Sequence, residues 1–332
     1  MFEQTQLATI FIGLMGLSVL MYAILDGYDL GVGMLLPLDN QKHADTMIAS
    51  IGPFWDANET WLVLAVGLLL IAFPHAHSLV LKELYLPATI LLIGLIMRGV
   101  AFDFRAKAAF SHKPLWDKAF KYGSWLATFA QGYMLGRYVT GFESGFLMEI
   151  FAITSGIGVC SAYIFIGATW LVMKTEGQLQ TDSLRHAKKA VVLAFVGVIL
   201  VSMANLALNP DIYQKWFTWP VGYFLFPIPI VCGALFAICY RVLQKLQAKP
   251  DIGAGLPFIL AILIFVLSFV GLGYSFYPYI VPNTLTIWQT VAAPESLNFL
   301  LFGTLIVIPT ILLYTAFSYR VFWGKVQELR YY

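Results

Sequence analysis

The chain has 332 residues, of which 60% are hydrophobic and only 11% are charged, whereas soluble proteins average about 45–50% and about 25%. These proportions exclude an ordinary soluble protein and predict an integral membrane protein. The formal net charge of +2 is small and no long basic run is present, so no nucleic-acid partner is expected. The three cysteines, Cys160, Cys232 and Cys239, lie in apolar segments without a Cys-x-x-Cys pair, which indicates neither a disulfide framework nor a zinc site.

Nine apolar segments are long enough to cross a membrane as helices, which takes about 20 residues each. The connections between them are short, so we expect a single integral membrane domain over 1–332 with an all-α fold. No Lys or Arg precedes the first apolar run, unlike in a cleaved secretory signal, and we expect the first helix to be retained. Pro220, Pro227 and Pro229 predict a kink or break near the start of the seventh segment. The segments are 7–35, 52–73, 79–101, 119–140, 146–173, 187–208, 217–241, 256–280 and 297–320.

The positions of Lys and Arg predict the orientation, because cytoplasmic connections are enriched in these residues. If the N-terminus lies outside, the cytoplasmic segments hold sixteen of the 20 Lys and Arg, the outer segments hold three, and Arg98 lies within a span. The sequence therefore predicts nine transmembrane helices, with the N-terminus outside and the C-terminus in the cytoplasm.

The first three predicted helices bring five acids and two arginines to one depth near the cytoplasmic face: Asp26, Asp29, Asp56, Glu59, Asp103, Arg98 and Arg105. A charge at membrane depth costs about 2.5–3.5 kcal/mol on insertion scales, so we interpret the acids as candidates for proton or cation uptake, with Arg98 and Arg105 as charge partners. Two simpler interpretations stay open. Asp56 and Glu59 can cap the N-terminus of their helix, or Arg98 can neutralise one aspartate and hold three helices together.

The histidines are expected in loops or at the ends of spans: His43, His75, His77, His112 and His186. A haem inside a membrane usually takes an axial His, Met or Cys from a span, and nothing marks any Met or Cys of this chain for that role. We therefore expect no catalytic residue and no metal or haem ligand in this chain.

Three stretches carry a family resemblance. They are Asp-Gly-Tyr-Asp-Leu-Gly-Val-Gly-Met-Leu-Leu-Pro at 26–37, Gly-Pro-Phe-Trp-Asp-Ala-Asn-Glu-Thr-Trp at 52–61, where Trp55 and Trp61 flank the acids, and Arg-Gly-Val-Ala-Phe-Asp-Phe-Arg at 98–105. A weaker match covers 276–288 and the last helix, with Gln289 where many relatives have an acid. Over essentially its whole length the chain resembles subunit II of the cytochrome bd quinol oxidases, and its modest length is similar to the short, cyanide-insensitive or bd-like branch.

The resemblance implies two four-helix bundles plus one extra helix, in a multi-pass protein of the bacterial cytoplasmic membrane. It implies a heterodimer in which subunit I carries haem b and haem d-type groups and the quinol site, while subunit II ligates no haem. Some members hold a structural quinone, and small accessory subunits are a further class of partner. The implied complex oxidises quinol at the outer face and reduces O2 to water with protons from the cytoplasm.

Two other classes of protein fit the same residues. A proton- or cation-coupled secondary transporter also places acids within its spans, although it favours sites near the midplane and often has inverted repeats, and no clear repeat is visible. A purely structural or assembly subunit would also be a multi-pass protein, but would need no buried acids.

Overall fold

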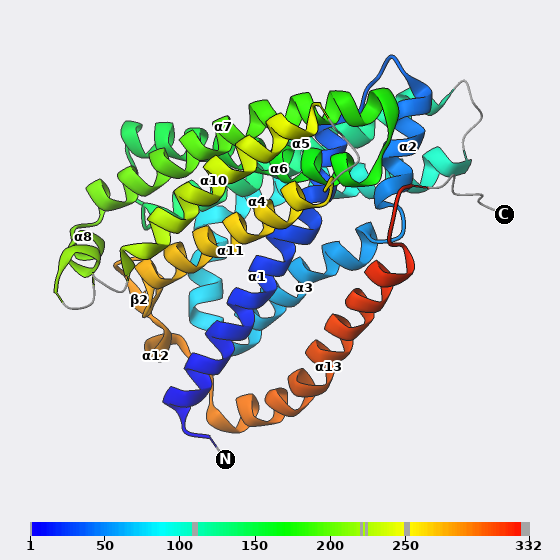
Figure 1. The fold of residues 1–332 in the computed structure, drawn as a ribbon. Coiled ribbons are helices and arrows are strands. Elements are labelled where there is room, and N and C mark those ends of the chain that lie inside the picture. Colours follow the sequence, from blue (N-terminus) through cyan, green and yellow to red (C-terminus); the bar gives the residue numbers. More distant parts are fainter. Residues whose placement is uncertain (1, 108–111, 220–221, 223–224, 249–252, 327–332) are drawn as a thin grey trace.

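The computed structural model describes residues 2–107, 112–219, 222, 225–248 and 253–326 of the chain. These residues form an almost entirely helical protein, with one short β-hairpin (Figure 1). The helices are α1 (Gln4–Leu35), α2 (Gln41–Ile51), α3 (Trp55–Ala72), α4 (Pro74–Lys107), α5 (Lys113–Val139), α6 (Phe146–Lys174), α7 (Gly177–Leu208), α8 (Pro210–Phe217), α10 (Pro227–Leu246), α11 (Leu256–Phe276), α12 (Ile287–Thr290) and α13 (Pro294–Val321), and the strands are β1 (Tyr279–Val281) and β2 (Leu285–Thr286).

Each of the nine predicted segments coincides with one long helix. Within the described residues, eight of these helices are long and apolar enough to cross a membrane. The ninth, α5, falls short of that apolar composition, because it begins with Lys113, Asp117, Lys118 and Lys121 and contains Arg137 near its end. It packs between α4 and α6.

Two helices, α7 and α10, begin at residues that differ clearly from the predicted ones. Helix α7 begins at Gly177, ahead of its predicted start, and therefore includes the exposed His186. Helix α10 begins at Pro227, after the predicted start of the seventh segment. Proline suits the first turn of a helix but interrupts its interior, which accounts for this start. Pro220 lies outside the described residues.

The long helices form two groups of four, and each group closes into a ring of contacts. The first bundle contains α1, α3, α4 and α5, and the second contains α6, α7, α10 and α11. The bundles meet where α5 and α1 pack against α6. At one such crossing the backbones touch: a Cβ atom built on Gly167 would lie 2.6 Å from the carbonyl carbon of Gly31. Glycine at both positions lets α1 and α6 approach this closely.

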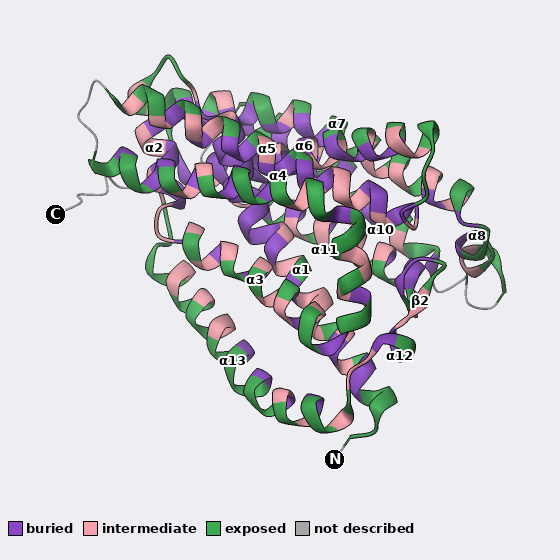
Figure 2. Cartoon of the chain, turned by 180° about the vertical axis from the view of Figure 1, so that it is seen from behind, coloured by how far each residue is buried: buried purple, intermediate pink, exposed green. Residues whose placement is uncertain are grey.

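The backbone of α13 lies away from both bundles in its middle part (Figures 1 and 2), where the Ile308 side chain is buried and Ile311 and Leu312 pack against the main core cluster. At its start, Leu297 and Leu301 are buried in one core cluster with Leu7 and Phe11 of α1. Between its ends α13 exposes a row of large apolar side chains, among them Leu305, Leu313 and Phe317.

A lysine of α6 fastens the other end of α13. The Lys174 ammonium donates to the carbonyl oxygens of Phe322, at 2.6 Å, and Gly324, at 3.0 Å. In return, the Val326 amide donates to the Lys174 carbonyl at 2.9 Å. The Lys174 ammonium also lies 5.0 Å from the centre of the Trp170 ring. The end of α13 is thus held against α6 by three hydrogen bonds, and the cation–π contact with Trp170, on the same helix, positions the Lys174 ammonium.

At the end of the molecule that contains the hairpin, α8 is fastened to α11. The Lys215 ammonium donates to the Tyr274 carbonyl at 2.7 Å and to the Tyr277 carbonyl, and lies 4.4 Å from the centre of the Tyr274 ring. Partial burial lowers the pKa of Lys215.

Gln289 of α12 accepts from the Thr286 amide at 2.8 Å and so caps this short helix.

Candidate functional site

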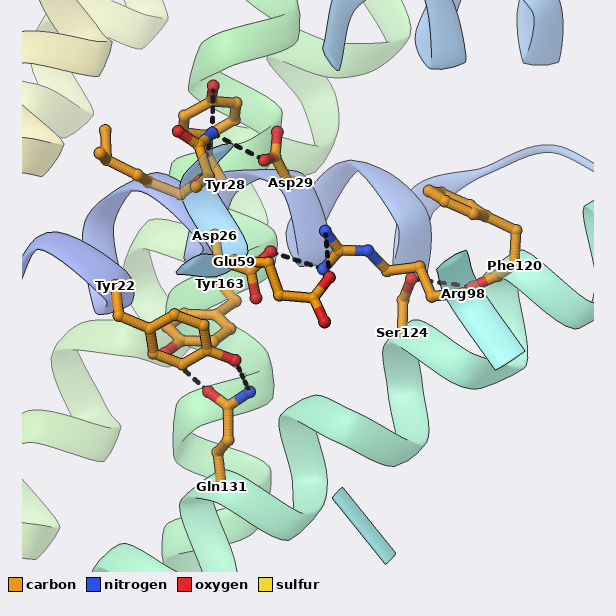
Figure 3. Close-up of polar contacts among 12 residues, drawn as sticks. Tyr22, Asp26, Tyr28, Asp29, Glu59, Arg98, Phe120, Ser124, Gln131 and Tyr163 are labelled. Atoms are coloured by element: carbon orange, nitrogen blue, oxygen red, sulfur yellow. Dashed lines mark hydrogen bonds and ion pairs between the residues drawn. The ribbon is translucent and has the colours of Figure 1, made fainter. Parts of the chain in front are cut away.

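The interior of the first bundle holds a group of charged side chains that we call the acid cluster: Asp26 and Asp29 of α1, Glu59 of α3 and Arg98 of α4 (Figure 3). Asp26, Asp29 and Arg98 are fully buried, while the Glu59 side chain is 27% exposed. The two aspartates are three residues apart and so lie close together on α1. Two of the three carboxyl groups, those of Asp26 and Glu59, lie within 4 Å of the Arg98 guanidinium.

Arg98 makes the strongest contact in the cluster. Its Nη1 donates to Asp26 Oδ1 at 2.6 Å, and its Nη2 lies 3.9 Å from Glu59 Oε2. The guanidinium carbon lies 6.0 Å from the centre of the Trp55 ring, which itself packs against Phe102. Removing two ions from water costs several kcal/mol for each, which close pairing offsets. The pair joins α1 and α4 although its residues lie 72 positions apart.

Asp29 has a different partner. Asn58 of α3 donates through Nδ2 to Asp29 Oδ2 at 2.8 Å, and the same nitrogen lies 3.0 Å from the Tyr28 hydroxyl. The Tyr28 hydroxyl lies 2.6 Å from the Tyr319 hydroxyl of α13. The cluster therefore continues, through an amide and two hydroxyls, to α13.

Asp26 is approached from the other side by a second chain of polar groups. Tyr163 of α6 donates to Gln131 Oε1 of α5 at 3.0 Å, and Gln131 Nε2 donates to the Tyr22 hydroxyl at 2.7 Å. The Tyr22 hydroxyl lies beside Asp26 (Figure 3). Since the Tyr22 oxygen accepts from Gln131, its proton is left for Asp26.

The remaining candidate residues do not all join the cluster. Asp56, in the first turn of α3, and Asp103, on α4, are exposed, and neither forms an ion pair with another described residue. Arg105 is buried in a separate network, where it donates to Asp117 Oδ1 at 2.5 Å and to Asp45 Oδ1 at 2.7 Å. Of the five predicted acids, the structure thus brings Asp26, Asp29 and Glu59 together around Arg98.

The two tryptophans of the second motif lie at different depths. Trp55 is partly exposed beside Arg98. Trp61 is 1% exposed, and its indole N–H has no hydrogen-bond partner among the described residues. Trp61 therefore belongs to the packed core of the bundle.

Sequence reasoning did not single out Asn58, Tyr28, Gln131 or Tyr319. Asn58 and Tyr28 lie within the motifs, next to the acids, and an amide inside an apolar helix is itself a signal of a buried partner. Tyr319, in contrast, carries no local signal. Its role depends on a contact 291 residues away.

The chemistry of the cluster suits protons and hydrogen bonds. Its donors and acceptors are carboxylates, amides, tyrosine hydroxyls and a guanidinium, and it includes none of the His, Met or Cys side chains that ligate most haem irons. The described residues contain no group of three or more His, Cys, Asp or Glu side chains arranged to hold a metal ion. The cluster therefore does not fit a haem or a metal ion.

A cavity of about 500 Å³ lies beside the cluster, lined by α1, α6, α7, α10 and α11. Most of its wall is apolar, and Tyr163, the last residue of the Gln131 chain, is part of it. Ser155 also lines it, is 1% exposed and has a hydroxyl without a hydrogen-bond partner among the described residues. The cavity suits an elongated apolar molecule that carries a hydrogen-bond acceptor.

Together these features define a multi-pass membrane protein with a buried ionisable site inside its first bundle. A family model for subunit II of the cytochrome bd terminal oxidases matches residues 7–322. The chain belongs to this family, as its motifs predicted. It is a subunit of an oxidoreductase and a multi-pass protein of the bacterial inner membrane. Membership of this family implies a complex with subunit I and haem groups held mostly by that partner.

Individual relatives agree with this assignment. The chain is 26% identical to the cytochrome bd-I ubiquinol oxidase subunit 2 of Escherichia coli strain K12, over 95% of this chain and 94% of the relative. It is also 26% identical to the cytochrome bd ubiquinol oxidase subunit 2 of Bacillus subtilis strain 168, over 92% and 93%. A chain of the bd oxidase structure from Geobacillus thermodenitrificans has the same fold, with a TM-score of 0.80 and 17% identity over 96% of this chain and 99% of that chain.

Proposed function

We propose that the acid cluster takes up protons from the cytoplasm and passes them toward the haem-bearing partner, where O2 is reduced to water. The observation that carries this proposal is the graded exposure of the carboxyl groups. Asp56 is exposed, Glu59 one turn further is 27% exposed, and Asp26 and Asp29 are fully buried. Ionisable groups arranged from the surface into a bundle are typical of proton routes in membrane proteins.

The charge balance supports the same function. Arg98 is within 4 Å of Asp26 and Glu59, and Asp29 is also buried nearby. One guanidinium offsets one carboxylate, and neighbouring carboxylates disfavour each other's charged forms. The cluster can therefore bind an additional proton and release it again. Arg98 pairs most closely with Asp26, at 2.6 Å, so Glu59 and Asp29 are the groups assigned to carry the proton.

This function is tested by replacing Asp56 with asparagine, which keeps the size and hydrogen bonding of the side chain but removes its titration. We expect Asp56→Asn to lower quinol-driven O2 consumption by at least about tenfold, since a positioned proton donor contributes about 10² or more, with haem content nearly unchanged. Asp39→Asn, at an exposed acid of the loop between α1 and α2, is the matched control and should keep full turnover.

The outcomes separate the two interpretations of the acids. Loss of haem with normal turnover for each remaining haem would mean that Asp56 only ties this subunit to its partner. Unchanged turnover and unchanged haem content across the pH range would mean that Asp56 neither carries protons nor ties this subunit to its partner.

A row of exposed side chains along one face of α3 supports a position for the partner subunit on this helix. Asp56, Val63 and Leu70 are seven residues apart and so share one face of this helix, and Val63 and Leu70 are exposed. An acid at the start of an otherwise apolar stripe would be costly against lipid. We infer that subunit I, which would carry the haem b and haem d-type groups and the quinol site, covers this face, with Asp56 at the edge of the contact.

We also propose the topology with nine spans, the N-terminus outside and the C-terminus in the cytoplasm, with α5 as the ninth span. The bias of sixteen Lys and Arg against three supports this orientation, and the contacts of α5 with α4 and α6 support its crossing. Reporter domains fused after Tyr332 should be active only as cytoplasmic reporters, and one inserted near Glu143 only as an external reporter. An external C-terminus would contradict the proposal.

The cavity supports a structural quinone in this chain. A quinone combines a long apolar chain with ring carbonyls that accept hydrogen bonds, and the buried Ser155 hydroxyl on the cavity wall is a donor of the required kind. Residues of α6, α7, α10 and α11 would hold the apolar chain.

A further inference from the structure

Helix α13 contributes one side chain to the hydrogen-bond chain that leads to Asp29 of the acid cluster. Tyr319 of α13 lies with its hydroxyl 2.6 Å from the Tyr28 hydroxyl. Its ring stacks on Phe54, with the centroids 4.5 Å apart. Lys174 holds the end of α13 just beyond it. Tyr319 is thus fixed in place from both sides.

The donors and acceptors of this chain have a definite order. An amide nitrogen has two hydrogens, and the two shortest bonds of Asn58 Nδ2 are those to Asp29, at 2.8 Å, and to the Tyr28 hydroxyl, at 3.0 Å, with the Leu25 carbonyl further away at 3.4 Å. The Tyr28 oxygen therefore accepts from Asn58. In the 2.6 Å bond between the two hydroxyls either could be the donor, and we assign Tyr28 as the donor because its oxygen already accepts from Asn58.

We propose that Tyr319 is a positioning residue for Asp29, a role that rests on the proposed function of the cluster in proton uptake. By accepting the Tyr28 proton, Tyr319 keeps the Tyr28 oxygen as an acceptor for Asn58. This orients the Asn58 amide so that its N–H group points at Asp29. A carboxylate accepts such a hydrogen bond, so the arrangement favours the ionised form of Asp29.

Without the Tyr319 hydroxyl, the order reverses. The Tyr28 proton is then free to bond the Asn58 carbonyl oxygen, which turns the amide over. In this flipped orientation the Asn58 amide oxygen faces the Asp29 carboxyl oxygen. Two such oxygens lie within hydrogen-bonding distance only when one of them carries a proton. Loss of one hydroxyl on α13 therefore favours the protonated form of Asp29.

The other charged groups around Asp29 stay in place when Tyr319 changes. Those whose charges act on it are Arg98 from α4, Asp26 from α1 and Glu59 from α3. From α6, Lys174 lies over Trp170, whose ring stacks on Tyr28 with the centroids 4.3 Å apart. The titratable hydroxyls in contact with Asn58 or its partner are those of Tyr28 and Tyr319.

The test uses the complete oxidase with Tyr319→Phe, which removes only the hydroxyl. The carboxyl C=O band that disappears in Asp29→Asn is followed by infrared spectroscopy as a function of pH. We expect Tyr319→Phe to raise the pH at which this band has half its intensity by about half a unit to one unit, the size of one hydrogen bond. The high-pH limb of the turnover profile should move in the same direction.

Tyr314→Phe is the matched control, because Tyr314 lies on the same helix and is 60% exposed. The proposal is supported if the Asp29 band shifts in Tyr319→Phe alone, with haem content unchanged. It is overturned if the wild type and Tyr319→Phe both lack the band, or if the band has the same midpoint pH in both. It is also overturned if Tyr314→Phe shifts the midpoint as much as Tyr319→Phe does. Because the infrared band does not depend on turnover, this result stands apart from that of Asp56→Asn.

Discussion

Replacing Arg98 with glutamine should abolish stable assembly of the oxidase. Arg98 and Asp26 are both fully buried and joined at 2.6 Å, so the variant leaves an ionised carboxylate inside the bundle without its cation. Breaking a buried ion pair in this way typically costs about 3–5 kcal/mol, a large part of the stability of a typical domain. The measurement is the yield of haem-containing complex and its melting temperature in detergent.

A second substitution shows whether the unpaired charge is the cause. Arg98→Gln combined with Asp26→Asn removes both charges and should recover much of the lost yield, since neutral partners leave no buried ion. Arg185→Gln is the matched control: Arg185 forms an ion pair with Asp182 at 3.4 Å, but its side chain is 61% exposed, and such pairs contribute little. Normal yield from Arg98→Gln alone would show that the pair does not hold the bundle together.

Adding one methyl group at the crossing of α1 and α6 should have an effect of similar size. In Gly31→Ala the new Cβ would collide with the Tyr163 carbonyl oxygen and lie 3.0 Å from the Gly167 Cα atom, and both are rigid backbone atoms. The two helices must separate, and overpacking of this kind costs about 3 kcal/mol or more when nothing flexible can move. We expect a sharp fall in melting temperature and in the amount of assembled complex.

Gly13→Ala is the control on the same helix. No atom lies within 4 Å of a Cβ built at Gly13, and alanine is a better helix former than glycine by about 1 kcal/mol. Gly31→Ala should therefore lower the melting temperature, whereas Gly13→Ala should raise it or leave it unchanged. Equal destabilisation by both would mean that helix flexibility, and not the close crossing, requires glycine in α1.

The number and order of the long helices could be derived from the sequence because hydropathy is a local property. Each of the nine predicted segments overlaps one long helix, and the errors lie at the ends, as at Gly177 and Pro227. The acids at 26, 29 and 59 were also recognisable, because a charge within an apolar helix is costly and therefore informative. The family followed from the same motifs.

Tertiary structure alone decided which of these groups meet. A helix sequence gives the spacing of its side chains but not the rotation of the helix against its neighbours. Close packing at Gly31 and Gly167 sets that rotation for α1, and as a result Asp26 faces Arg98. On α4, which packs closely on α5 at Gly94 and Gly123, Asp103 stays exposed and Arg105 pairs with Asp117. Tyr319 reaches Tyr28 only because Lys174 holds the end of α13 against α6, a contact that no local pattern records.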